Sequence, residues 1–145
     1  MIQVVPDSSV VAKWFLIEED TESALALARA HEQGAIRLTA PELLAYEVAN
    51  AVASKTQMGL DRVLAAMEVF FDTDIEMSSI EREVLDTALR LSDLTGLALY
   101  DAYFGAFALR RDAYLVTADQ KMVRGLQDIV RVVPLDRWPP AELSR

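Results

Sequence analysis

Short runs of apolar, mostly β-branched residues alternate along the chain with longer segments of helical spacing. The predicted strands cover residues 2–5, 36–39, 74–77, 113–117 and 130–133. The predicted helices cover residues 10–16, 21–33, 42–58, 60–71, 79–92, 100–111 and 119–125. Regular alternation of this kind predicts a parallel sheet with helices on both faces. The length of 145 residues, without a repeat or linker, predicts a single domain covering residues 1–145.

Glycine, proline and capping residues indicate where several of these elements begin and end. Pro6 ends the first predicted strand, because proline has no N–H to donate to a sheet. Gly34 ends a helix, and Pro41 fits the first position of the next helix. The segment from Thr117 to Gln120 fits a capping box and therefore predicts the short helix that follows it.

Charge and residue usage exclude several classes of protein. A net charge of −9 disfavours a dedicated duplex-DNA binder, unless bound metal ions supply positive charge. The chain has no cysteine, which excludes disulfides and thiolate metal sites. The single histidine, His31, is too few for an imidazole zinc site, and we expect it to be solvated. No apolar run reaches the ~18 residues of a membrane span, and no signal peptide is recognisable, so we expect a cytoplasmic protein.

Four acidic residues occupy positions where different elements can converge. Asp7 follows the first strand at once, and Asp119 follows the fourth strand by two residues. Asp101 opens the helix that leads into the fourth strand. Glu47 lies inside an apolar helix, and its i, i+3 spacing places Asn50 on the same face. Ligands of open α/β sheets bind at the carboxyl ends of strands, so neighbouring first and fourth strands would bring these acids together.

Each acid also has an interpretation that involves no chemistry. Asp7 can simply cap the helix that follows it. Asp101 and Asp119 can lie at helix N-termini because the helix dipole favours negative charge there. Glu47 can be solvated on a helix edge. If the acids do converge, their mutual repulsion requires cations between them, and carboxylate oxygens suit Mg²⁺ or Mn²⁺.

Four motifs resemble those of PIN-domain ribonucleases. They are Asp7-Ser-Ser-Val, Pro41-Glu-Leu-Leu-Ala-Tyr-Glu47-Val-Ala-Asn50-Ala, Tyr100-Asp101-Ala-Tyr and Leu115-Val-Thr117-Ala-Asp119-Gln-Lys. Their order and spacing are similar to those of the VapC-type toxins of bacterial and archaeal toxin–antitoxin pairs. The resemblance covers the whole chain. Each motif is weak alone, so the identification depends on the ordered set.

This resemblance implies a three-layer α/β/α PIN-like fold, with a five-stranded parallel sheet in the order 3-2-1-4-5. The catalytic pocket that it implies contains Asp7, Glu47, Asp101 and Asp119. Of these, Asp7, Asp101 and Asp119 would bind Mg²⁺ or Mn²⁺, while Glu47 would bind a second metal or position a water. The implied supporting residues are Ser8, Asn50 and Thr117.

The implied activity is endonucleolytic cleavage of RNA by a water that the metal activates. The implied partners are the RNA substrate, a second copy of the chain in a homodimer, and an antitoxin with a basic and apolar inhibitory segment. No membrane partner is expected.

Basic and aromatic residues offer candidate contacts with RNA. The basic candidates are Lys13, Arg110, Arg111, Lys121 and Arg124, each of which is otherwise an ordinary surface charge. The aromatic candidates for base stacking are Trp14, Tyr100 and Tyr103, although a core role suits Trp14 better.

Two other function classes share parts of this pattern. A phosphoacceptor signalling domain also places acids at strand ends, but no acid follows a strand in the middle of this chain. A catalytically silent binding module would be expected to lack pocket acids, and all four are present. A flap-type DNA nuclease is related to the main hypothesis, but the chain lacks the insertions of such enzymes.

Overall fold

The sheet at the centre of the molecule has the strand order expected from the family resemblance. The computed structural model describes residues 1–55, 57 and 59–144. Among these residues the strands are β1 (Gln3–Pro6), β2 (Arg37–Pro41), β3 (Glu76–Ser78), β4 (Tyr114–Thr117) and β5 (Val132–Pro134). They form one five-stranded sheet in the order β3-β2-β1-β4-β5, with all neighbours parallel. The prediction of a parallel α/β sheet is confirmed.

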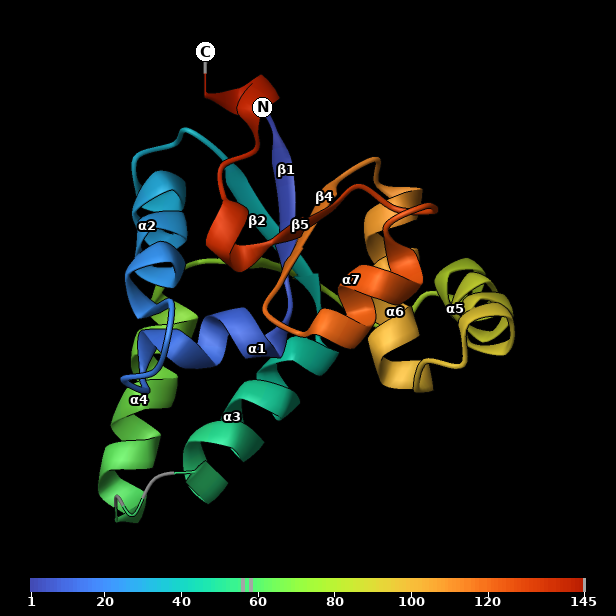
Figure 1. Cartoon of the computed structure of the whole chain (residues 1–145). Coiled ribbons are helices and arrows are strands. Elements are labelled where there is room, and N and C mark those ends of the chain that lie inside the picture. The colour runs from blue at the N-terminus through green and yellow to red at the C-terminus, as the bar shows by residue number, and fades with distance from the viewer. Residues whose placement is uncertain (56, 58, 145) are drawn as a thin grey trace.

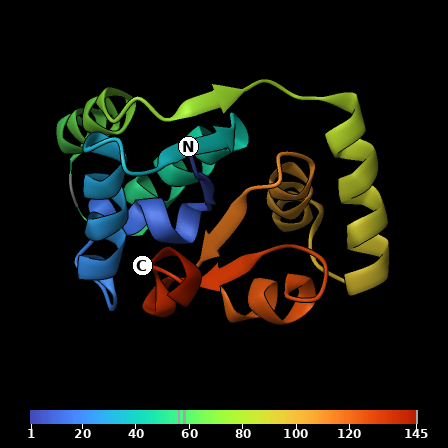
Figure 2. The ribbon, with the colours of Figure 1, turned by 90° about the horizontal axis from the view of Figure 1, so that it is seen from above.

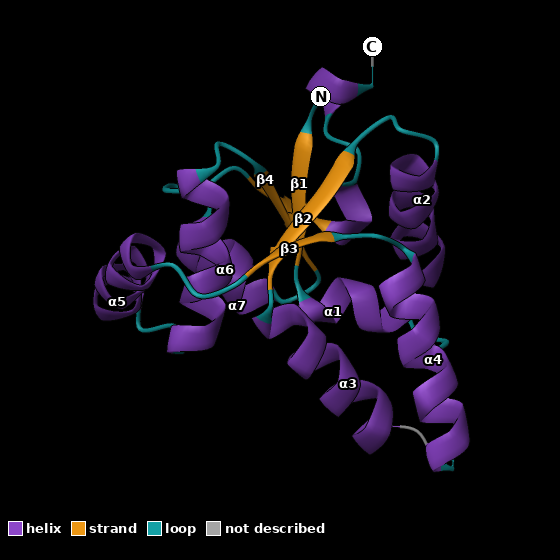
Figure 3. Ribbon diagram, turned by 180° about the vertical axis from the view of Figure 1, so that it is seen from behind, coloured by secondary structure: helices purple, strands orange, loops and turns teal. Residues whose placement is uncertain are grey.

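Helices cover both sides of this sheet. Their bounds are α1 (Ser8–Val11), α2 (Thr21–Glu32), α3 (Leu43–Lys55), α4 (Leu60–Asp72), α5 (Arg82–Thr95), α6 (Leu99–Arg110) and α7 (Gln120–Leu126). Figure 3 shows α5, α6 and α7 on one side of the strands and α1, α2 and α4 on the other. Seen from above in Figure 2, α5 lies at the opposite end of the molecule from α2 and α4. The arrangement is the three-layer α/β/α fold.

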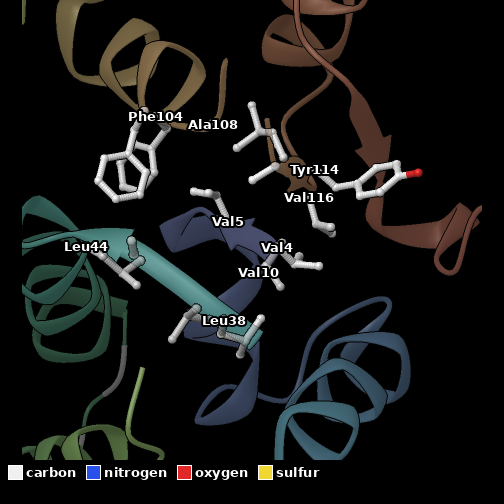
Figure 4. Close-up of a cluster of buried hydrophobic side chains, with 14 of the residues drawn as sticks. Val4, Val5, Val10, Leu38, Leu44, Phe104, Ala108, Tyr114 and Val116 are labelled. Atoms are coloured by element: carbon white, nitrogen blue, oxygen red, sulfur yellow. The ribbon is translucent and has the colours of Figure 1, made fainter. Parts of the chain in front are cut away.

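The core forms where β1 runs between the two helical layers. Val4 and Val5 are fully buried, as the doubly apolar first strand predicts. Because successive strand side chains point to opposite faces, Val5 is directed towards Phe104 and Ala108 of α6, while Val4 lies on the other side with Val10 (Figure 4). The first strand is therefore anchored on both faces, which holds its carboxyl end in place.

Several predicted boundaries differ from the structure. Pro41 ends β2 rather than opening a helix, because it pairs in register with Ser78 of β3. Thr117 does not cap α7: Asp119 is the N-cap, and its Oδ1 accepts a hydrogen bond from Lys121 N at 2.8 Å. The predicted helix end at Met58 lies outside the described residues.

His31 is not a solvated side chain, so that expectation was wrong. Its Nδ1 accepts a hydrogen bond from the backbone N–H of Leu38 in β2 at 3.1 Å. Its Nε2 lies 2.9 Å from the carbonyl oxygen of Thr73, in the turn after α4. Because Nδ1 accepts, the ring proton is on Nε2, which donates a hydrogen bond to the Thr73 carbonyl. His31 thus ties α2 to the sheet and to the turn before β3.

The topology brings three chain segments to one edge of the sheet. The carboxyl ends of β1, β2 and β4 lead into α1, α3 and α7, and all three transitions lie at the lower end of the strands in Figure 1. The N-terminus of α6 lies at the same end. None of the helices in the described part of the chain is long and apolar enough to cross a membrane.

Candidate functional site

The four acids predicted from the sequence come from four different elements at this edge. Asp7 follows β1 and is the N-cap of α1. Asp119 follows β4 and is the N-cap of α7. Asp101 lies in the first turn of α6, and Glu47 lies on α3. Asp7, Asp101 and Asp119 therefore lie at helix N-termini, as expected if they only stabilise those helices. A shared site requires in addition that the four acids interact with one another.

Asp7 is the buried centre of the site. Its side chain is only 4% exposed, although a helix cap is normally at the surface. Oδ1 accepts hydrogen bonds from Ser9 Oγ at 2.5 Å and from Val10 N at 3.3 Å. Oδ2 accepts a hydrogen bond from Thr117 Oγ1 at 2.5 Å. Asp7 is thus a cap that also joins the end of β1 to the end of β4.

Burial makes the charge of Asp7 costly. Loss of solvation raises its pKa from the ordinary 3.8 to about 6, although the hydrogen bonds from Ser9, Thr117 and Val10 oppose the rise. The negative charge of Asp119 raises it further. A carboxyl that changes its charge near pH 6 inside a fold is typical of a functional site.

Glu47 and Asp101 respond to the same group of charges. Burial raises the pKa of Glu47, a hydrogen bond from Ser8 lowers it, and the charges of Asp101 and Asp7 raise it. Burial raises the pKa of Asp101, which the charge of Asp119 raises further and that of Lys121 lowers. Each acid interacts electrostatically with at least one of the others, so the four form one cluster. We call Asp7, Glu47, Asp101 and Asp119 the acidic cluster.

The predicted supporting residues differ in how closely they join this cluster. Thr117 is buried and bonds Asp7 directly. Ser8 interacts with Glu47. Asn50 is exposed, and its carbonyl accepts a hydrogen bond from Ser54 within α3. The sequence reasoning missed Ser9, whose hydroxyl bonds Asp7; the only signal was that two hydroxyl residues follow Asp7.

Two of the basic candidates are committed elsewhere. Lys13 is 8% exposed and pairs with Glu18, with Nζ 3.2 Å from Oε2. Arg111 pairs with Glu81 at 2.8 Å and stacks over the ring of Phe107. Neither is therefore the freely solvated surface charge that the sequence suggested as the alternative to an RNA contact. The remaining candidates, Arg110, Lys121 and Arg124, are exposed.

Lys121 is a basic residue whose charge reaches the acidic cluster. It lies in the first turn of α7, next to the cluster, and lowers the pKa of Asp101. Arg110 lies at the last residue of α6, at the opposite end of that helix from Asp101.

An apolar groove of about 430 Å³ opens beside the acidic cluster. Its residues include Tyr46 and Tyr100, the sequence neighbours of Glu47 and Asp101. Tyr46, Ile80 and Tyr100 are 76%, 74% and 62% exposed, which is unusual for such large apolar side chains in one place. Tyr103, also at this groove, is buried and accepts a hydrogen bond from Glu81 N, so it belongs to the core. Trp14 likewise has a structural role, because its Nε1 donates to the carbonyl of Ala24.

The donor atoms of the acidic cluster fit a hard divalent cation. All four residues offer carboxylate oxygens, the ligands that Mg²⁺ and Mn²⁺ prefer. Within residues 1–55, 57 and 59–144, no three acidic or histidine side chains are already placed as a metal-binding group. Both oxygens of Asp7 are directed at hydroxyl groups instead. A bound cation would reduce the repulsion among these negative charges, which adds to the effect of burial in raising the pKa values of Asp7, Glu47 and Asp101.

Comparisons with known proteins agree with this fold. A family model described as PIN domain matches residues 4–125. No curated protein matches the sequence. Similar solved structures include a toxin–antitoxin complex from Klebsiella pneumoniae, with 17% identity, a TM-score of 0.68 and coverage of 91% of this chain and 97% of that one.

Two further structures of the same fold are complexes with DNA. DNA-bound VapBC from Salmonella typhimurium has 15% identity and a TM-score of 0.67, and the match covers 93% of this chain and 99% of that one. VapBC2 from Rickettsia felis, bound to a promoter fragment, has 13% identity and a TM-score of 0.67, with coverage of 92% and 98%. At identities this low, the structural matches show a shared fold and nothing further.

Proposed function

The chain belongs to the PIN domain family, and from this premise we propose that it is a divalent-metal-dependent endoribonuclease. We further propose that it acts in the cytoplasm as the VapC-like toxin of a toxin–antitoxin pair. The observation that carries the proposal is the acidic cluster, whose members come from the end of β1, α3, α6 and the β4–α7 turn and whose charges help to raise the pKa values of Asp7, Glu47 and Asp101. Carboxyl groups with raised pKa values that gather in one place are typical of functional sites.

The residues of the cluster have distinct proposed roles. Asp7 and Asp101 would hold the cation, together with Asp119, which would bind it directly or through a water. Glu47 would position the attacking water or hold a second cation. A bound Mg²⁺ or Mn²⁺ would make a water nucleophilic at neutral pH and stabilise the charge of the leaving oxygen. Lys121, at the edge of the cluster, is suited to a phosphate of the RNA.

A cleavage assay with matched RNA and DNA oligonucleotides tests this function. The purified protein should cut the RNA with Mg²⁺ or Mn²⁺ and should not cut it with excess chelator. Asp101→Asn should lower the rate roughly a hundredfold or more, because it removes a charged ligand and keeps the side-chain shape. Asp128→Asn, at an exposed position, serves as the control for loss of a negative charge. Undiminished cleavage in chelator would contradict the metal-dependent mechanism.

The proposed inhibitory partner is an antitoxin with a basic and apolar segment. The acidic cluster would attract an Arg or Lys of this segment, since complementary charge guides association. The apolar groove beside it, with Tyr46, Ile80 and Tyr100, would receive apolar side chains. A structure of the complex that left both the cluster and the groove open would rule this out.

We also propose a homodimer, on the family resemblance alone. Light scattering at micromolar concentration should give about twice the chain mass of 16.1 kDa. A mass equal to that of one chain would contradict it.

A further inference from the structure

The helix α7 carries positive charge beside an acidic site, in a chain whose net charge is −9. Its charged residues are Lys121 and Arg124, and it contains no acid. Among the helices in the described part of the chain, α7 alone combines basic residues with the absence of an acidic one: α2 to α6 each carry at least one Asp or Glu, and α1 carries no charge. The charge of α7 is therefore opposite to the average charge of the chain.

The exposed face of α7 consists of basic and amide side chains. We call its four exposed polar residues, Gln120, Lys121, Arg124 and Gln127, the α7 face. Residues three or four apart lie on the same side of a helix, about 5–6 Å from one another, so Arg124 lies next to both Lys121 and Gln127. Within residues 1–55, 57 and 59–144, neither Lys121 nor Arg124 forms a salt bridge. Both charges are therefore available to an anionic partner.

The α7 face begins at the acidic cluster and leads away from it. Asp119 is the N-cap of α7, and the charge of Lys121 lowers the pKa of Asp101. Arg124 lies about one turn further along, and Gln127 follows the last residue of the helix, about 10 Å from its start. In Figure 1, α7 begins near the lower end of the strands and lies beside α6. An extended polyanion held at the acidic cluster can therefore continue along α7.

The side chains of the α7 face suit the sugar–phosphate backbone of a nucleic acid. Arg, Lys and Gln are among the residues that bond phosphate oxygens, and such contacts position the nucleic acid without reading its bases. The apolar groove does not offer an equivalent surface, because it is lined by side chains such as Tyr46 and Ile80 and by the acidic Glu42. A basic inhibitory segment would be attracted to the acidic cluster and repelled by Lys121 and Arg124, so the α7 face does not suit that partner.

We propose that the α7 face holds the backbone of the RNA substrate where the strand leaves the acidic cluster, with Lys121 and Arg124 on successive phosphates. The inference rests on the proposed ribonuclease function. It adds Arg124 as a positioning residue for the substrate and gives the strand a path along one side of the site. Because only the backbone is contacted, the α7 face should bind RNA strands of different sequence equally well.

The salt dependence of RNA binding tests this path. Anisotropy of a short fluorescein-labelled single-stranded RNA is measured with the full chain, with Ca²⁺ in place of Mg²⁺, while a gel checks that the RNA stays intact. Arg124→Gln should weaken binding roughly threefold to tenfold and should lower the slope of log affinity against log salt by about 0.7. Replacing Lys121 by Gln as well should lower the slope by about 1.4. Two RNAs of unrelated sequence should show the same loss.

A matched control and a kinetic measurement separate a local contact from a general charge effect. Arg29→Gln removes the same charge from an exposed position on α2, which lies on the other side of the sheet (Figure 3), and its salt slope should equal that of the wild type. In the cleavage assay with Mg²⁺, Arg124→Gln should raise KM by the factor lost in affinity and leave kcat unchanged. The reason is that a backbone contact away from the reacting phosphate is equally strong in the ground state and the transition state.

The outcomes distinguish this inference from the proposed function. If the wild type binds and cuts RNA, but Arg124→Gln and Arg29→Gln have the same salt slope, the path along α7 is refuted while the ribonuclease function stands. If polyglutamate displaces the labelled RNA as effectively as unlabelled RNA does, the α7 face is a site for acidic protein segments and its assignment to RNA is wrong. If the wild type cuts no RNA, yet binds it with an affinity that Arg124→Gln lowers, the ribonuclease function fails and the α7 face remains as an RNA-binding surface.

Discussion

Replacing Asp7 by Asn should destabilise the protein at acidic pH and stabilise it at neutral pH. The pKa of Asp7 rises from 3.8 to about 6 on folding, and each pH unit of that rise corresponds to about 1.4 kcal/mol. Because the folded pKa is raised, the favourable contribution of Asp7 is fully present below pH 3.8 and is lost as the pH rises through about 6. At pH 7.5 the ionised, buried carboxylate therefore lowers the free energy of unfolding by about 3 kcal/mol.

The Asn side chain avoids this charge but bonds its surroundings less well. Its amide oxygen can accept a hydrogen bond from one hydroxyl, while its NH₂ group faces the other, at a cost of about 1–2 kcal/mol at any pH. At pH 4.0 the variant should therefore be less stable than the wild type by roughly that amount. At pH 7.5 it should be more stable by about 1–2 kcal/mol. The difference between variant and wild type should change by about 2–3 kcal/mol across this range.

Urea denaturation in chelator, at pH 4.0 and pH 7.5, measures this change. The same experiment on Asp128→Asn, an exposed acid, controls for the loss of one negative charge from a chain of net charge −9. That control should differ from the wild type by less than about 0.5 kcal/mol at both pH values. If the effect of Asp7→Asn is the same at pH 4.0 and 7.5, Asp7 does not hold a costly charge in the fold, and the reasoning on the acidic cluster fails.

Three further predictions concern the cation, the core and His31. Millimolar Mg²⁺ should raise the melting temperature of the wild type by mass action and raise that of Asp7→Asn less; equal shifts would place the cation elsewhere. Gly105→Ala should cost about 1–3 kcal/mol in denaturation experiments, because its Cβ would lie 2.9 Å from a terminal methyl of the buried Leu126, whereas Gly59→Ala meets nothing within 4 Å. His31→Ala should cost about 1–3 kcal/mol, since it leaves a β2 amide without its acceptor; an unchanged midpoint would contradict the structural role of His31.

The sequence predicted the elements and the acids better than it predicted their partners. Alternating strand and helix patterns located each strand to within a few residues, because hydrophobic periodicity is a local signal. Asp7 and Asp119 were correctly placed at strand ends for the same reason. Ser9 was missed, because successive residues of a helical turn point about 100° apart and the sequence does not show which of two adjacent serines faces Asp7.

Specific partners, most of them far apart in the sequence, account for the other errors. Lys13 is buried and pairs with Glu18 five residues along the chain, while Arg111 pairs with Glu81 thirty residues away and its guanidinium lies over the ring of Phe107. His31 bonds a carbonyl 42 residues away, a contact that no local pattern encodes. Pro41 follows the rule for a helix start, but pairing with β3 overrides that propensity.

The hydrogen bond between Thr117 and Asp7 joins residues that are 110 positions apart. Its formation requires β4 to add beside β1 after most of the chain has been synthesised, and contacts of such long range slow folding because a long loop must close. A nascent chain that ends before β4 therefore contains Asp7 but has neither the hydroxyl nor the Asp119 that complete its surroundings. Any truncation before residue 117 therefore removes Thr117 and Asp119 and leaves Asp7 without its hydrogen bond to β4.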